Sequence, residues 1–285
     1  MAARPLLLIP ALALSLNAQV SRPPIVGVAN ITLRTNDMAG AQQFYGKFLG
    51  FAGEASFAVN DHQYIDVEPG LAAETQDRLV RIGFETTDAR QLRDYVASRG
   101  VKVPDSVAPN RDGDLSFTIA DPDGHEVFFV QYMPDSKRSR AVSIDAVSHR
   151  MIHVGVVIQD QAAADRLYRD ILGFTDIWHG GMKDTVTDWV DMRVPDGTDW
   201  LEYMLNVHNP SPRTLGVMHH LALGVPSVQA GYEAVTARGY RSKEKPQIGR
   251  DGKWQFNMYD PNLTRVELME PKPVRTPCCS PIRSD

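Results

Sequence analysis

One stretch of the sequence decides how the chain is organised: DMAGAQQFYGKFLGF, at Asp37–Phe51. A second stretch, DQAAADRLYRDILGF at Asp160–Phe174, repeats its pattern 123 residues further on without a gap. In both, apolar residues recur at helical spacing and end at a glycine, Gly50 or Gly173, which predicts an amphipathic helix with a glycine stop. A matched pair of this length indicates an internal duplication.

A second set of matches has an offset of 139 residues and supports the duplication. The matched segments are 98–100 with 237–239, 111–113 with 250–252, and 121–122 with 260–261. Chance is a poor explanation for one offset kept over so many positions. We therefore divide the chain into an N-terminal half, 25–133, and a C-terminal half, 150–271. A polar, basic linker at 134–149 joins them, and a Pro-, Ser- and Arg-rich flexible tail at 272–285 follows.

Each half divides into two smaller units of the same order. In the N-terminal half, a β-type run at 31–34 precedes the first helix and further β-type segments follow it. The pattern restarts at 80–84, with a helix over 88–98 and strands at 115–119 and 126–131. The order β, α, then three β-strands occurs four times in the chain, which predicts an α+β fold.

Composition excludes several classes of protein. A formal net charge of −5 leaves no basic face for nucleic acid. A hydrophobic fraction of 43% excludes global disorder. The longest apolar run, at 6–16, is too short to span a membrane. Only Cys278 and Cys279 are cysteines, so we exclude a disulfide scaffold and a Cys-ligated zinc site, and we assign this pair no catalytic role.

The first eighteen residues have the pattern of a secretory signal peptide. A short positive start is followed by an apolar stretch and then by small residues before a polar one. We expect cleavage after Ala18, and therefore a secreted or periplasmic protein with no membrane span.

Paired motifs in the two halves resemble those of the vicinal oxygen chelate superfamily, which includes glyoxalase I, bleomycin resistance proteins and type I extradiol dioxygenases. The motifs are Phe44-Tyr45 with 49–51, Leu167-Tyr168 with 172–174, and the closing segments 121–124 and 260–262. In this superfamily paired βαβββ units curl into an open barrel that holds a metal. The resemblance therefore implies four βαβββ units forming two tandem glyoxalase-like open barrels.

The resemblance also implies a metal site in the C-terminal half. The family's ligand positions, on the first and last strands of each unit, fall on His153, Glu202, His220 and Glu267. Two imidazoles and two carboxylates suit an octahedral divalent ion with two positions left for water or substrate. We expect one divalent ion per chain, and zinc, nickel, cobalt, manganese or iron would all fit.

The N-terminal half is expected to have lost its metal site. The repeat offsets place Asn30, Asp66, Arg81 and Phe128 at the four ligand positions. Arg81 brings a positive charge and Phe128 brings no donor atom. Only the C-terminal half is therefore predicted to be catalytic.

The four-ligand set favours a glyoxalase-like lyase or isomerase acting on a small oxygenated substrate through a metal-bound enediolate. In this reading Glu267, or Glu202, moves a proton between adjacent carbons as general base. Asn206, four residues after Glu202, matches the glyoxalase pattern and is expected to contact substrate.

Two alternatives stay open. A ferrous-iron extradiol dioxygenase would use two His and one Glu, and its pattern has a tyrosine where this chain has Asn257, with Tyr259 close by. Asn257 and Tyr259 are, like Asn206, expected to contact substrate. A bleomycin-resistance-like protein would bind its ligand without catalysis, in a pocket lined by Trp178, Trp189, Trp200 and Trp254. In each reading the partner is a small molecule, and the chain is a monomer or a homodimer.

Overall fold

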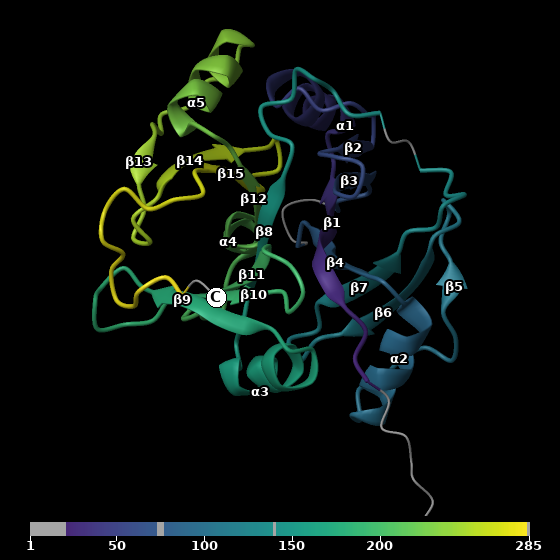
Figure 1. Cartoon of the computed structure of the whole chain (residues 1–285). Helices are drawn as coiled ribbons and strands as arrows, with labels where there is room; N and C mark the ends of the chain where they lie inside the picture. The colour runs from purple at the N-terminus through teal and green to yellow at the C-terminus, as the bar shows by residue number, and fades with distance from the viewer. Residues whose placement is uncertain (1–20, 73–76, 139–140, 284–285) are drawn as a thin grey trace, which may run out of the picture.

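The computed structural model describes residues 21–72, 77–138 and 141–283, and the expected signal peptide, 1–18, lies outside them. Within these residues the chain forms two curled sheets, each covered by helices (Figure 1). This confirms the predicted α+β fold with two tandem glyoxalase-like domains. Among the described residues, no helix combines the length and apolar character needed to cross a bilayer.

The N-terminal sheet has the strand order β2-β3-β1-β4-β7-β6-β5 in the described part of the chain. Its strands are β1 (Ile25–Thr35), β2 (Ser56–Ala58), β3 (Tyr64–Pro69), β4 (Leu79–Thr86), β5 (Ala108–Pro109), β6 (Leu115–Ala120) and β7 (Glu126–Gln131). The helical segments of this domain are α1 (Met38–Ala41), its π-helical continuation η1 (Gln42–Phe48) and α2 (Ala89–Ser98). Strands β1 and β4 pair antiparallel at the centre, where the two units of the domain meet.

The C-terminal sheet repeats this plan with the order β13-β14-β15-β12-β8-β11-β10-β9. Its strands are β8 (Met151–Val157), β9 (Thr175–Gly180), β10 (Trp189–Arg193), β11 (Trp200–Met204), β12 (His220–Gly224), β13 (Gln247–Ile248), β14 (Trp254–Tyr259) and β15 (Arg265–Met269). Its helical segments are α3 (Gln161–Asp165), η3 (Arg166–Ile171), α4 (Pro212–Met218) and α5 (Val228–Ala237). Here the antiparallel pair β8 and β12 joins the two units.

The repeated helix begins and ends alike in both halves. Its first turn is capped by an aspartate: the Asp37 side chain accepts a hydrogen bond from Gly40 N at 2.8 Å, and the Asp160 side chain accepts one from Ala163 N at 3.0 Å. Both helices then widen into a π-helical segment, a feature the sequence did not predict. Both stop at a glycine with φ near +80° (81° at Gly50), as the sequence predicted.

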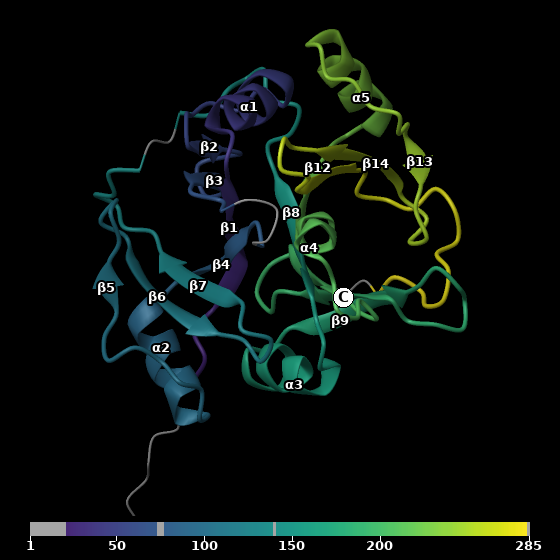
Figure 2. The same cartoon turned by 180° about the vertical axis from the view of Figure 1, so that it is seen from behind.

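The two domains share one hydrophobic core. Strands β1 and β8 lie side by side at their boundary in both views (Figures 1 and 2). The ring of Phe84 meets that of Phe174 edge-on across this boundary, with centroids 5.2 Å apart. A large buried apolar area stabilises a fold, so we expect the two halves to unfold together.

Two buried hydrogen bonds connect the domains reciprocally. Tyr45 Oη donates to Asp260 Oδ2 at 3.1 Å, and Tyr168 Oη donates to Asp121 Oδ2 at 3.1 Å. Each tyrosine belongs to the repeated helix, and each aspartate to the Asp-Pro turn of the other domain. The helix motif of one half thus binds the turn motif of the other.

Residues 272–283 differ from the expected flexible tail, because they lie against the C-terminal sheet. Trp178 Nε1 donates to Cys278 O at 3.2 Å, and Arg283 N donates to Ile177 O at 2.7 Å, so the segment follows β9. Cys278 and Cys279 are joined by a disulfide. Composition alone did not reveal these long-range backbone contacts.

Candidate metal centre

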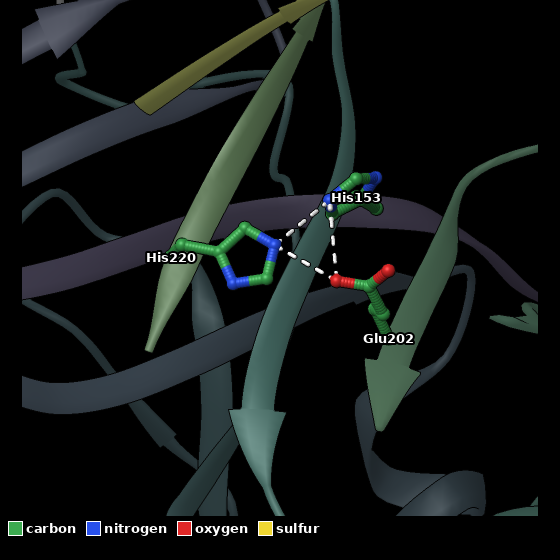
Figure 3. Close-up of side chains that lie close together, drawn as sticks. All are labelled: His153, Glu202 and His220. Atoms are coloured by element: carbon green, nitrogen blue, oxygen red, sulfur yellow. Dashed lines mark hydrogen bonds and ion pairs between the residues drawn. The ribbon is translucent and has the colours of Figure 1, made fainter. Parts of the chain in front are cut away.

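Two histidines and a glutamate converge on one face of the C-terminal sheet (Figure 3). His153 lies on the central strand β8, Glu202 on β11 and His220 on β12, and both outer strands pair with β8. The register places Glu202 and His220 directly opposite Gly155, one on each side. Side chains two residues apart on a strand share a face, so His153 joins this row.

Gly155 makes room for the row. A Cβ atom at this position would overlap the imidazole of His220, so only glycine allows the ring to lie across β8. The sequence already places this glycine two residues after His153. The strand pairing shows why a glycine is needed at this distance from His153: it leaves space for the ring of His220.

The donor atoms are close enough to share one ion. Glu202 Oε2 lies 2.9 Å from His220 Nε2, and the two Nε2 atoms of His153 and His220 are 3.1 Å apart. Glu202 Oε2 lies 4.0 Å from His153 Nε2. Three ligand atoms gathered this closely in a buried place fit a divalent cation bound by nitrogen and oxygen.

The histidines are held in the protonation state that metal binding requires. His220 Nδ1 lies 2.8 Å from the carbonyl oxygen of Met218, which only accepts, so Nδ1 carries the proton and Nε2 offers its lone pair. Burial lowers the pKa of His220 to about 3. Burial likewise holds the pKa of His153 well below its usual value, so both rings are neutral.

Glu267, the fourth expected ligand, lies at the edge of this cluster. Its Oε2 is 3.7 Å from His153 Nε2, and its Oε1 is 3.3 Å from the guanidinium of Arg265. The side chain is 5% exposed. The structure therefore brings both predicted carboxylates to the histidines, Glu202 closely and Glu267 beside an arginine.

The cluster opens into a cavity of about 330 Å³. Three of the four tryptophans considered above line it, Trp178, Trp189 and Trp200, whereas Trp254 packs against the main core. Trp178 and Trp189 are stacked, with centroids 6.5 Å apart and an interplanar angle of 14°. The cavity wall is therefore largely aromatic on one side.

Sequence reasoning assigned no role to several charged residues in or beside this cavity. Asp191 lies opposite Glu202 on the neighbouring strand, and burial, reinforced by the charge of Glu202, raises its pKa well above the usual value. Lys253 sits 4.9 Å above the Trp200 ring and pairs with Asp251 at 3.2 Å. Asp251 lies in the repeated segment 250–252, which was given no role in the site, and no motif indicated Asp191 or Lys253. Alternation along β10, which places Asp191 between two apolar neighbours, was the available signal for Asp191.

Of the three residues expected to contact substrate, one lines the cavity and two lie outside its lining. Asn257 lines the cavity. Asn206 lies outside its lining: with φ at 61° it forms a turn and donates from Nδ2 to Asp188 Oδ1 at 2.8 Å. Tyr259 is also outside that lining and donates to Glu244 Oε1 at 3.0 Å.

The N-terminal half has different residues at the equivalent positions. Asp66 and Arg81 lie opposite Thr32 on its two sides, as Glu202 and His220 lie opposite Gly155. Asn30 Nδ2 donates to Asp66 Oδ2 at 2.9 Å, and the Arg81 guanidinium lies 5.3 Å from the Phe128 ring centroid. The register thus supports the alignment of the halves, and the residues at these four positions do not form a divalent-metal donor set.

Comparison with known proteins identifies relatives of this arrangement. Residues 150–268 match the Glyoxalase/Bleomycin resistance protein/Dioxygenase superfamily. A search of curated protein sequences gave no match.

Several solved structures share the whole fold. Homoprotocatechuate 2,3-dioxygenase from Brevibacterium fuscum, in complex with 3,4-dihydroxyphenylacetate, superposes with a TM-score of 0.66 at 18% identity, over 92% of this chain and 86% of its own. The 2,3-dioxygenase LapB from Pseudomonas sp. KL28 gives 0.64 at 13% identity, over 90% and 97%. The Arthrobacter globiformis homoprotocatechuate 2,3-dioxygenase gives 0.64 at 17% identity, over 87% and 80%. At these identities the likeness concerns the fold.

Proposed function

The C-terminal domain, residues 150–268, belongs to the glyoxalase/bleomycin resistance protein/dioxygenase superfamily, and from this premise we propose that the protein is an extradiol-type dioxygenase dependent on a divalent metal. The observation that carries the proposal is the convergence of two neutral imidazoles and a glutamate in one buried row, which among the described residues occurs in the C-terminal half only. Two histidines and one carboxylate form the facial triad typical of non-haem iron oxygenases. The two-domain fold shared with extradiol dioxygenases favours this reading over the glyoxalase-like one.

In this proposal His153, His220 and one of the two glutamates hold the ion. When bound, ferrous iron supplies the one-electron chemistry that lets dioxygen react with an organic substrate. His220 keeps its ring in place through the Nδ1 hydrogen bond to Met218 O, which preserves the direction of its lone pair. The remaining glutamate lies in the same cavity and accepts a proton from a substrate hydroxyl as general base.

The cavity walls suit a small aromatic diol. The stacked rings of Trp178 and Trp189 offer a flat apolar surface, and Trp200 packs against His153 with centroids 4.8 Å apart. Once a substrate fills the cavity, these side chains help to exclude water beside the cluster, which strengthens each charge interaction within it.

A glyoxalase-like lyase or isomerase is the second candidate, and one observation favours it. Both carboxylates lie near the histidines, Glu202 at 2.9 Å from His220 Nε2 and Glu267 at 3.7 Å from His153 Nε2, which suits four ligands, whereas a facial triad requires only one carboxylate. Under that reading, proton transfer between adjacent carbons replaces oxygen consumption.

Oxygen uptake separates the two candidates. The full chain is loaded anaerobically with ferrous iron and mixed with catechol in air-saturated buffer, with zinc-loaded protein as the control. We expect equimolar oxygen uptake and a coloured ring-cleavage product with iron only. Anaerobic isomerisation of a 2-oxoaldehyde, without oxygen uptake on any catechol, would contradict the dioxygenase and support the lyase.

Two matched variants assign the glutamates. Glu202→Gln and Glu267→Gln each preserve side-chain size while removing the charge. The variant that loses iron identifies the ligand, and the variant that keeps iron but loses about 10²–10⁴-fold in turnover identifies the base. Full turnover in either variant would contradict the roles proposed here.

Export is a further part of the proposal. It rests on the pattern of the first eighteen residues, with cleavage after Ala18. N-terminal sequencing of the protein recovered from its producing cells tests it. An uncleaved N-terminus on cytoplasmic protein would contradict it.

A further inference from the structure

The N-terminal domain keeps a cavity where its metal site would be. Its volume is about 390 Å³, against about 330 Å³ for the cavity of the C-terminal domain. The loop at 110–112 lines the first cavity as the equivalent loop at 249–251 lines the second. The domain has therefore exchanged the residues at the ligand positions without filling the space around them.

One row of side chains crosses the sheet in this cavity. Asp66 on β3 and Arg81 on β4 flank Thr32 on β1. Neighbouring strands are about 4.8 Å apart, so the backbones that carry the carboxylate and the guanidinium are separated by about 10 Å. Asn30 Nδ2 donates to Asp66 Oδ2 and to Thr32 Oγ1, which accepts from Arg81 Nε, so the floor between the two charges is polar and a small molecule would lie in the cavity over it.

Neither charge of this row forms a direct ion pair among the described residues, although Arg138 in the same cavity lining attracts Asp66 electrostatically. Asp66 accepts hydrogen bonds from the neutral side chains of Asn30 and Ser56. Arg81 donates from Nε to Thr32 Oγ1 at 3.2 Å and rests against the Phe128 ring, and no carboxylate lies within ion-pair distance of it among the described residues.

The other acids of the cavity are already paired. Glu68 binds Arg34 at 2.9 Å, and Asp112 binds Arg138 at 3.3 Å. The row therefore presents to the cavity a guanidinium and a carboxylate that are not joined in a direct ion pair, and the carboxylate also feels the charge of Arg138. A guanidinium binds a carboxylate through two parallel hydrogen bonds, and a carboxylate with two neutral donors keeps acceptor capacity for an ammonium group.

We propose that the N-terminal cavity is a binding site for a small amino acid, with its carboxylate on Arg81 and its ammonium group on Asp66. The site is distinct from the metal centre and does not depend on the reaction proposed for it. Replacing a metal-ligating histidine by Arg81 changes the preference of the position from a cation to an anion. Thr32 and Phe128 hold the guanidinium in place between binding events.

An isosteric ligand series tests the proposal by titration calorimetry on the full-length, metal-loaded protein. L-alanine, L-lactate and propionate differ only in carrying an ammonium, a hydroxyl or a hydrogen beside the carboxylate. We expect L-alanine to bind at least about tenfold more tightly than propionate, with lactate between them. Equal affinity for propionate, or no binding of L-alanine, would overturn the proposal.

Substitutions in the N-terminal cavity test whether L-alanine binds there. Arg81→Met keeps the apolar stem over Phe128, and Asp66→Asn keeps hydrogen-bonding capacity towards its neighbours. Each is expected to weaken L-alanine about tenfold to a hundredfold while metal content stays unchanged. Arg90→Met, at an exposed arginine on α2, is the matched control and should bind normally. His220→Ala removes the metal centre and should leave L-alanine affinity unchanged.

Two results would overturn the location. One is unchanged affinity in both Arg81→Met and Asp66→Asn. The other is loss of binding in His220→Ala, which would place the carboxylate on the metal. Arg81→Lys serves as a second variant should Arg81→Met unfold, because it keeps the charge and loses the paired hydrogen bonds, and it should still bind more weakly than the native protein.

Discussion

The two halves of this chain carry the same cavity with opposite chemistry. In both, a row of three residues crosses the central strands: Glu202, Gly155 and His220 in one domain, and Asp66, Thr32 and Arg81 in the other. The strand pairing fixes the position of the row in both domains. The residue at its end, His220 on β12 or Arg81 on β4, decides whether the row can bind a cation. A carboxylate beside a neutral imidazole is a metal donor set, whereas a carboxylate opposite a guanidinium is not.

Exchanging the decisive residue should have the largest effect. His220→Arg gives the C-terminal row the residue of the N-terminal row, so its charge should repel a divalent ion. We expect loss of bound metal and a fall in turnover of more than about 100-fold, since even residues that only orient ligands cost 10–100-fold. Metal analysis and oxygen uptake measure this.

The reverse exchange is the control. Arg81→His should not create a second metal site, because Phe128 supplies no donor and Asn30 stands in place of a histidine. A second equivalent of metal in Arg81→His would show that one residue is enough, and would contradict this reading of the row.

Gly155→Ala should have the next largest effect. The added methyl group overlaps the ring of His220, so the ring must move and metal affinity should fall about 10–100-fold. Gly83→Ala is the matched control, because its methyl group would overlap Asn30 in the N-terminal domain. Competition with a chelator measures both affinities, and equal losses in the two variants would indicate a general folding defect.

The two interdomain tyrosine–aspartate hydrogen bonds should differ in their pH dependence. Burial alone would raise the pKa of Asp121, but the hydrogen bond and charge of His125 outweigh it and hold the pKa below its usual value. Burial raises the pKa of Asp260 to about 6, since a threonine, Thr264, replaces the histidine there. Asp121 is therefore ionised throughout pH 5–8, and Asp260 becomes ionised only above about pH 6.

We therefore expect Tyr168→Phe to cost about 2 kcal/mol in the free energy of unfolding at both pH 5 and pH 8. Tyr45→Phe should cost about 1 kcal/mol at pH 5, where Asp260 is neutral, and about 2 kcal/mol at pH 8, where a buried carboxylate loses its donor. Urea unfolding at the two pH values measures this. An equal cost of Tyr45→Phe at pH 5 and pH 8 would contradict the raised pKa assigned to Asp260.

The smallest expected effect concerns His125. Burial opposes its charged form, but the carboxylate of Asp121, 2.8 Å from Nδ1, outweighs burial and raises the pKa of His125. Its stabilisation is therefore fully present below the unfolded-state value near pH 6.5 and is lost as pH rises through the higher folded-state value. His125→Gln should cost roughly 1 kcal/mol more at pH 6 than at pH 9, whereas a larger cost at pH 9 would contradict this sign.

Much of the fold followed from the repeat, and the rest depended on contacts between distant residues. The duplicated helix and the Asp-Pro turns are local patterns, so the four units could be predicted from spacing. The π-helical widening, the docking of 272–283 on β9 and the reciprocal tyrosine–aspartate bonds arise from tertiary packing. No pattern along the chain indicated them.

In the candidate site, too, some features could be predicted from local patterns and others depended on contacts between distant residues. The positions of His153, His220 and both glutamates followed from the repeat and the resemblance. Their unequal surroundings did not, because the 2.9 Å contact between Glu202 and His220 depends on the pairing of β11 and β12 with β8. Asn206 has the expected residue type at the expected spacing, yet its φ of 61° turns it away from the cavity. Sequence spacing predicts which face a residue occupies only while the strand continues. Asn206 lies beyond the end of β11, so the prediction does not apply to it.

Metal stoichiometry tests the central claim most directly. Inductively coupled plasma mass spectrometry is applied to the full chain, to His220→Ala and to Arg81→Met after identical purification and reconstitution. The account predicts one divalent ion per chain in the native protein and in Arg81→Met, and none in His220→Ala. Two ions per chain, or an ion retained in His220→Ala and lost in Arg81→Met, would contradict it.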